Sequence, residues 1–200
     1  LFGADGVLTV AECAAVVRAR RSWLAQHGWA RARARPVALE ARATPDQVLW
    51  LLTLIEAGLP FVPLHPRLTP VERDRLLRDA GASLLPALAA GASAPPTDPG
   101  DPDPIDPETP LAIIPTSGTS GRAKLAVLSR RAFAASAAAS AANLGRRDDD
   151  RWLLALPPAH VGGLSIVTRA LCDRSALVPW GEGGFDAARL VAVVAAQYCG

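Results

Sequence analysis

Residues 111–124 have the sequence LAIIPTSGTSGRAK, in which a short apolar run leads directly into a loop of glycines and hydroxyl side chains. Leu111 to Pro115 is predicted to be a buried strand, because a brief apolar run bounded by turn residues suits a strand. Glycines let the backbone approach a polyphosphate, and exposed N–H groups, hydroxyls and an ammonium group can bind its oxygens. The stretch therefore predicts a strand followed by a phosphate-binding loop.

Lys124 closes this loop and is the only lysine among 21 basic residues. Lysine carries a compact charge on a flexible stem, whereas arginine is a planar fork, so a site that must follow a moving phosphate favours lysine. We expect the glycines to give the backbone room and the other side chains to bind phosphate oxygens. The predicted phosphate-binding residues are Thr116, Ser117, Gly118, Thr119, Ser120, Gly121 and Lys124.

The spacing of these residues argues against a Walker-type phosphate loop. Counted from Gly118, that motif requires glycine at position 123 and serine or threonine directly after the lysine. The sequence has Ala123 and Leu125 at these two positions. A plain turn rich in serine and glycine, with no ligand, stays as the alternative interpretation.

Upstream of the loop, three helix starts share one pattern. Thr9, Thr44 and Thr69 each have glutamate or glutamine three residues later, as helix N-caps do. Each of the three helical runs stops at a glycine, which is typical of a helix C-terminus. We expect helices over residues 10–27, 45–57 and 70–80, and strands over 37–41 and 60–64.

Downstream of the loop, the alternation of strands and helices continues. We expect strands over 125–128, 152–156 and 176–180, and helices over 130–143, 162–172 and 186–197. This alternation predicts an α/β fold with parallel-type sheets flanked by helices, as one large domain or two subdomains. We divide the chain into a first α/β part over 1–89, a linker rich in Pro, Asp and Ala over 90–110, and a second α/β part over 111–200 that carries the phosphate loop.

The composition is that of a globular protein, with 50% hydrophobic residues, 20% charged residues and a net charge of +2. A charge this small does not indicate nucleic acid or a membrane surface as a partner. The longest apolar run, Val48 to Ile55, is far shorter than the roughly 20 residues that span a bilayer. Cys13, Cys172 and Cys199 lack the spacing of a zinc site or a disulfide framework, so we expect small buried thiols in a reducing cytoplasm.

Three motifs of the chain resemble the adenylate-forming superfamily of acyl-CoA synthetases and AMP-binding enzymes. The stretch 116–125 is similar to its signature Thr-Ser-Gly-Thr-Thr-Gly-x-Pro-Lys-Gly, with Ser120, Ala123 and Leu125 as departures. Residues 58–66, GLPFVPLHP, resemble a second segment, in which the family has Asn or Asp at the position of His65. Residues 156–164, LPPAHVGGL, resemble a third. The order of the three motifs also matches the family.

The resemblance implies an acid–CoA ligase, with ATP, Mg²⁺ and coenzyme A. A carboxylate would attack the α-phosphate of ATP, and the thiol of coenzyme A would then displace AMP. The segment around His160 most resembles the o-succinylbenzoate–CoA ligases of menaquinone biosynthesis. In this family the histidine lies beside the acyl pocket and the route of the thiol, which implies that role for His160, with Gly163 nearby. A histidine that only packs against its neighbours is the alternative for His160.

We expect the chain to be the N-terminal part of a longer protein, because it starts at Leu1 and contains no methionine. The resemblance implies that the Mg²⁺-binding glutamate and the domain with the catalytic lysine lie past Gly200. We therefore assign no catalytic residue and no metal ligand here, and expect no acyl-adenylate formation by residues 1–200 alone. An adenylation domain that loads a carrier protein and a non-catalytic ATP-phosphate-binding module are the alternatives. The expected partners are small molecules, and a homodimer is left open.

Overall fold

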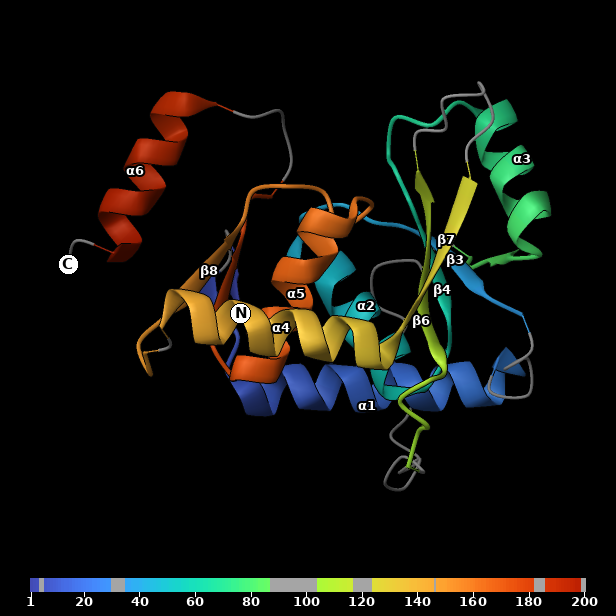
Figure 1. Cartoon of the computed structure of the whole chain (residues 1–200), viewed down its shortest axis with the longest axis horizontal. Helices are drawn as coiled ribbons and strands as arrows, with labels where there is room; N and C mark the ends of the chain where they lie inside the picture. Colours follow the sequence, from blue (N-terminus) through green and yellow to red (C-terminus); the bar gives the residue numbers. More distant parts are fainter. Residues whose placement is uncertain are drawn as a thin grey trace.

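A computed structural model of the chain describes residues 1–3, 6–29, 35–86, 104–116, 124–145, 147–181 and 186–198. The protein has an α/β fold, as predicted, with a five-stranded sheet, a two-stranded parallel sheet and a short N-terminal hairpin (Figure 1). Within the described ranges, no helix combines the length and the apolar character that crossing a membrane would require.

The helices and strands have the following bounds. The helices are α1 Val10–Gln26, α2 Pro45–Glu56, α3 Pro70–Ala80, α4 Arg130–Leu144, α5 Val161–Asp173 and α6 Ala187–Tyr198. The strands are β1 Phe2–Gly3, β2 Gly6–Val7, β3 Val37–Glu40, β4 Phe61–Leu64, β5 Ser83–Leu84, β6 Pro110–Thr116, β7 Lys124–Ser129, β8 Arg151–Leu154 and β9 Ala176–Pro179. Strands β1, β2 and β5 were not predicted, because two residues are too few to show an alternating pattern.

The three predicted threonine caps are confirmed. The Thr9 and Thr69 hydroxyls accept hydrogen bonds from the N–H groups three residues later, at 3.2 and 3.3 Å. The carboxylates of Glu12 and Glu72 accept the N–H of the capping threonine in return, at 2.7 and 2.8 Å, which completes two capping boxes. Thr44 accepts the N–H of the third helical residue at 3.4 Å. These local bonds explain why the helix starts were readable from the sequence.

The five-stranded sheet has the strand order β5-β3-β4-β6-β7 and is mixed. The pairs β3–β5, β3–β4 and β4–β6 are parallel, as expected. The pair β6–β7 is antiparallel, which the prediction of parallel-type sheets did not include. The reason is the short connection over 117–123, since a parallel crossover needs a dozen or more residues. β7 is also an edge strand rather than a buried one, and Val127 is 59% exposed.

Helices cover both faces of this sheet. Phe61 packs in a cluster with residues of α1, α2, α4 and α5, whereas Val62 and Leu64 pack with Leu76 of α3 on the opposite face. A third cluster joins β8 and β9 to α2 and α5. α5 contributes Leu164 to the first cluster and Val167 to the third, so it connects the two sheets.

Residues 90–103 of the predicted linker, and 87–89 before it, lie outside the described residues, and the domain boundaries at 89, 90, 110 and 111 stay predictions. Ile105, which follows these residues along the chain, lies against Gly58. A β-carbon at Gly58 would be 3.0 Å from the Ile105 Cδ1 atom. Gly58 also has φ +70°, a conformation that favours glycine. The chain thus returns to the first part before it enters β6, which adds to the same sheet as β3 and β4.

Candidate functional site

The predicted phosphate loop connects the two strands of a β-hairpin. Thr116 and Lys124 are paired across β6 and β7, and the Thr116 hydroxyl donates a hydrogen bond to the Lys124 carbonyl oxygen at 3.2 Å. Both residues are exposed at the end of the hairpin. Ser117, Gly118, Thr119, Ser120 and Gly121 lie outside the described residues, so their role stays a prediction. A Walker loop leads into a helix, whereas this loop leads into a strand, which is a second argument against that motif.

The ends of three strands meet at the edge of the sheet from which the loop starts. β3, β4 and β6 are parallel neighbours, so their carboxyl ends lie at one edge. Glu40 is paired with Leu64, and the pairing of Phe61 with Ala112 places His65 level with Thr116 four residues further on. Ligands of open α/β sheets bind outside this edge.

His160 reaches this region from another part of the chain. It is the N-cap residue of α5, makes no side-chain capping bond and is exposed. Its ring lies 5.1 Å from the ring of His65, between ring centroids, with the two planes at 50°. The structure therefore brings together a histidine with a predicted role and one to which the sequence analysis gave none. The sequence did set His65 apart, since it stands at a position where the resembled family has Asn or Asp.

His65 is held in a defined orientation. Its Nδ1 atom accepts a hydrogen bond from the Arg67 N–H at 3.1 Å, and its carbonyl accepts one from the Leu68 N–H at 3.1 Å. Partial burial lowers the pKa of His65, with smaller contributions from the charges of His160 and Arg67. A neutral ring that accepts at Nδ1 carries its proton on Nε2. At neutral pH, His65 thus presents an N–H donor beside His160.

Gly163, the other predicted acyl-site residue, has a structural reason to be glycine. It is buried, and a β-carbon there would lie 2.4 Å from the Pro157 carbonyl oxygen and 2.6 Å from that of Leu156. Such approaches to backbone atoms are far inside van der Waals contact. The start of α5 can therefore pack on the 156–157 backbone, which fixes where His160 begins the helix.

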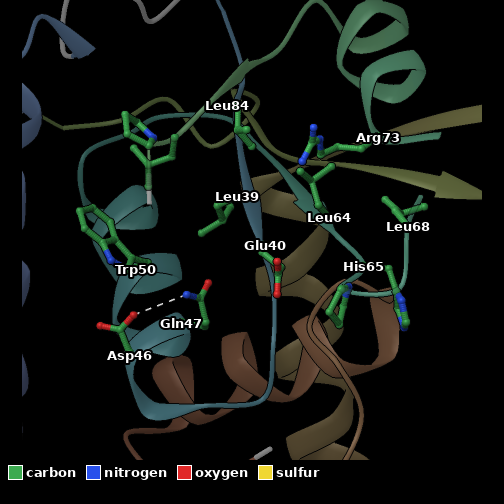
Figure 2. Close-up of a pocket in the computed structure, with 13 residues that line it drawn as sticks. Leu39, Glu40, Asp46, Gln47, Trp50, Leu64, His65, Leu68, Arg73 and Leu84 are labelled. Atoms are coloured by element: carbon green, nitrogen blue, oxygen red, sulfur yellow. Dashed lines mark hydrogen bonds between the residues drawn. The ribbon is translucent and has the colours of Figure 1, made fainter. Parts of the chain in front are cut away.

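A cavity of about 400 Å³ opens beside His65 at the carboxyl ends of β3 and β4. Figure 2 shows Trp50 and Asp46 of α2 on one side of it, Arg73 of α3 and His65 on the other side, and Glu40 between the two sides. Glu40 is ion-paired with Arg42, and Asp46 with Arg20. The two carboxylates are thus already neutralised, and the cavity adjoins the histidine pair through His65.

Other candidate groups play no part in this site. His27 ends α1 and stacks on Trp23 at 4.1 Å, in agreement with the predicted helix-end position. Cys172 is exposed, so the expectation of a buried thiol was wrong for it, while Cys13 is half-buried. Partial burial and the charge of Asp173 raise the pKa of the Cys172 thiol, which opposes its use as a nucleophile. Cys199 lies outside the described residues.

Solved structures with this fold are numerous. O-succinylbenzoate CoA synthetase from Bacillus subtilis, in complex with its acyl-adenylate intermediate, matches with a TM-score of 0.83 and 21% identity, over 98% of this chain and 55% of that one. ATP-bound MatB from Rhodopseudomonas palustris matches with a TM-score of 0.78 and 23% identity, over 98% of this chain and 44% of that one. The chain thus spans about half the length of these structures, and at such identity the likeness shows the fold.

The sequence comparison goes further than the fold. The family model for the AMP-binding enzymes matches residues 2–199, which is nearly the whole chain. Comparison with curated proteins gives no match. Because the family match covers both sheets, the phosphate-loop hairpin and the histidine pair, the chain belongs to the AMP-binding enzyme family.

Proposed function

We propose that the protein to which this chain belongs is an ATP-dependent acid–CoA ligase. A carboxylate oxygen attacks the α-phosphorus of ATP, the bond to the β-phosphate breaks, and acyl-adenylate and pyrophosphate form. The coenzyme A thiol then loses its proton and its sulfur attacks the acyl carbonyl, which releases AMP. The proposal is supported by the hairpin that presents Thr116 and Lys124 at the end of β6, and by the contact of His160 with His65 at the end of the neighbouring strand β4.

In this proposal, the phosphate loop binds the β- and γ-phosphates. The Lys124 ammonium group is exposed at the end of the hairpin, where it can approach a bound polyphosphate without breaking any described hydrogen bond. The hydroxyls and backbone N–H groups of 116–121 would donate to phosphate oxygens. Mg²⁺ would neutralise phosphate charge when bound with ATP, and we assign it no ligand among the described residues.

His160 and Gly163 would border the acyl group. His160 is exposed and carries no capping bond, so its ring nitrogens are available to a ligand. Gly163 acts through the backbone, because only glycine lets α5 begin so close to residues 156–157.

We further propose o-succinylbenzoate as the first acid to test, since solved o-succinylbenzoate CoA synthetases share the fold and the His160 segment resembles that group. This choice would place the protein in menaquinone biosynthesis and, with its need for ATP and coenzyme A, in the cytoplasm. The structure of MatB shares the fold equally, so the acid is decided by assay and not by fold.

Acid-dependent exchange of pyrophosphate into ATP, measured on the full-length protein with a panel of acids, tests the first half-reaction. Thioester formation with coenzyme A, compared with transfer to a phosphopantetheinylated carrier protein, tests the second. Turnover with the carrier protein alone would replace the ligase by a carrier-loading enzyme. ATP binding without exchange for any acid would leave a phosphate-binding module.

A further inference from the structure

His65 and His160 come from segments that are far apart in the sequence. His65 follows β4 in the central sheet, and His160 starts α5, which also packs on β8 and β9. Their rings are 5.1 Å apart at an interplanar angle of 50°, which is a common geometry for two packed rings. The pair is thus the point where the edge of the central sheet meets the helix that bridges both sheets.

The two histidines differ in how they are held. The ring of His65 is anchored by the Arg67 N–H at 3.1 Å within a tight turn, and the side chain is half-buried. The ring of His160 is exposed and makes no capping bond to its own helix. The ring contact with His65 therefore restricts the directions in which the His160 ring can point.

We propose that His65 is a positioning residue, whose ring orients His160 toward the sheet edge beside Thr116. This inference rests on the proposed function, in which His160 borders the acyl group. The charged groups around His65 fit this role: Glu40 is paired with Arg42, and Arg67 adjoins the ring on its own turn. A neutral His65 orients its neighbour without adding a positive charge to that of Arg67.

The substitution His65→Asn separates positioning from a purely structural role. The Asn Oδ1 atom can replace Nδ1 as the acceptor of the Arg67 N–H, because Asn forms the same local turn through its side chain. The turn is then kept while the ring that touches His160 is lost. His65→Ala removes both the ring and the acceptor of the Arg67 N–H. Its difference from His65→Asn therefore shows the effect of losing the turn. His27→Gln serves as the matched control, since His27 stacks on Trp23 at the end of α1.

The chain contains three histidines, so the imidazole signals of its NMR spectrum can each be assigned by one substitution. We expect a nuclear Overhauser effect between the rings of His65 and His160. We also expect His65→Asn to shift the His160 signals and leave those of His27 unchanged, with an unaltered melting temperature. His160→Gln should raise the pKa of His65, because one repelling charge is removed.

Unchanged His160 signals in a folded His65→Asn variant would overturn the proposal, and so would the absence of the inter-ring effect. These measurements need no enzyme activity, so they stand even if the ligase assay fails. In an active full-length enzyme, His65→Asn should raise KM for the acid by about tenfold and leave KM for ATP unchanged. The reason is that a misplaced His160 ring weakens binding of the acyl group alone. An equal rise of both KM values would also contradict positioning.

Discussion

The five-stranded sheet and the two-stranded sheet differ in how completely they are covered. All four residues of β4 are buried between β3 and β6, with helices on both faces. In β8 and β9, the buried residues are Leu154, Leu177 and Val178. Parallel strands require cover on both faces, so the stability of this chain resides mainly in the larger sheet.

The helices that follow the two sheets show the same difference. α2 buries seven of its twelve residues, whereas α6 leaves Val191 69% and Val194 39% exposed. Figure 1 shows α6 apart from the other helices, and its described ties to the body include the Arg189 guanidinium over the Trp180 ring at 4.5 Å. The candidate site lies at the junction of these two unequal regions, where α5 carries His160.

The largest effect on the free energy of unfolding is expected when one buried leucine in each of the two regions is replaced by alanine. Leu54 of α2 is 0% exposed in the main core, and Leu177 of β9 is 6% exposed beside the smaller sheet. Leu54→Ala should lower the free energy of unfolding by about 4 kcal/mol and Leu177→Ala by about 2 kcal/mol, because the second cavity can collapse more easily. Urea denaturation measures both, and a larger loss for Leu177→Ala would reverse the comparison.

The next effect concerns the two adjacent glycines of α5. Gly163→Ala places a methyl group 2.4 Å from the Pro157 carbonyl oxygen and should cost about 2–3 kcal/mol, since backbone must move. Gly162→Ala meets the Leu156 side chain at 3.4 Å and should stabilise α5 by about 0.5 kcal/mol through helix propensity. Melting temperatures measured on both variants check this. Equal melting temperatures of the two variants would show that the backbone at residues 156–157 can move to make room for the added methyl group without loss of stability.

The third effect is on ligand binding and leaves the fold intact. Lys124→Ala removes an exposed charge from the end of the hairpin and should weaken ATP binding about 10- to 100-fold, as expected for a charge-assisted bond of about 1.5–3 kcal/mol. Lys124→Arg should recover part of the affinity. Isothermal titration of the full-length protein measures this, with Arg147→Ala as a control that removes a distant surface charge. Equal losses of ATP affinity for Lys124→Ala and Arg147→Ala would mean that Lys124 contributes only a non-specific electrostatic attraction to ATP.

Much of the larger region was predictable from the sequence, because its signals are local. The Thr9 and Thr69 caps depend on residues three positions apart. Lys124 was distinguished by being the only lysine in the sequence. The antiparallel direction of β7 was not predicted from the periodicity of the strands, although the connection over 117–123 is too short for a parallel crossover. The partnership of His65 with His160 was missed because it depends on how α5 packs against the carboxyl end of β4, which no spacing in the sequence encodes.

A smaller effect is expected on α6. Val191→Ser replaces an exposed apolar side chain and should change the free energy of unfolding by less than about 0.5 kcal/mol. The matched buried change, Val48→Ser in α2, should cost several times more, because Val48 is 0% exposed. Chemical denaturation of both variants measures the contrast. A loss for Val191→Ser as large as that for Val48→Ser would show that α6 is covered in solution.

The smallest effects are two pH dependences, one for the junction and one for the helices of the larger region. The pKa of His65 is lowered by burial, so the unfolded chain binds its proton more readily, and stability falls as the pH drops below about 6.5. The pKa values of Glu12 and Glu72 are lowered by hydrogen bonds from Thr9 and Thr69, so their contribution is present above about pH 4.5 and is lost below it.

Two substitutions separate these windows. His65→Asn should flatten the stability profile near pH 6 alone. Glu72→Gln keeps the capping box but cannot titrate, so it should remove the Glu72 part of the profile below about pH 4.5 and leave the Glu12 part. Melting temperatures measured from about pH 2 to about pH 8 resolve both windows. If Glu72→Gln changed the profile near pH 6, the acid sensitivity of the junction would have to be assigned to α3 and not to the histidine pair.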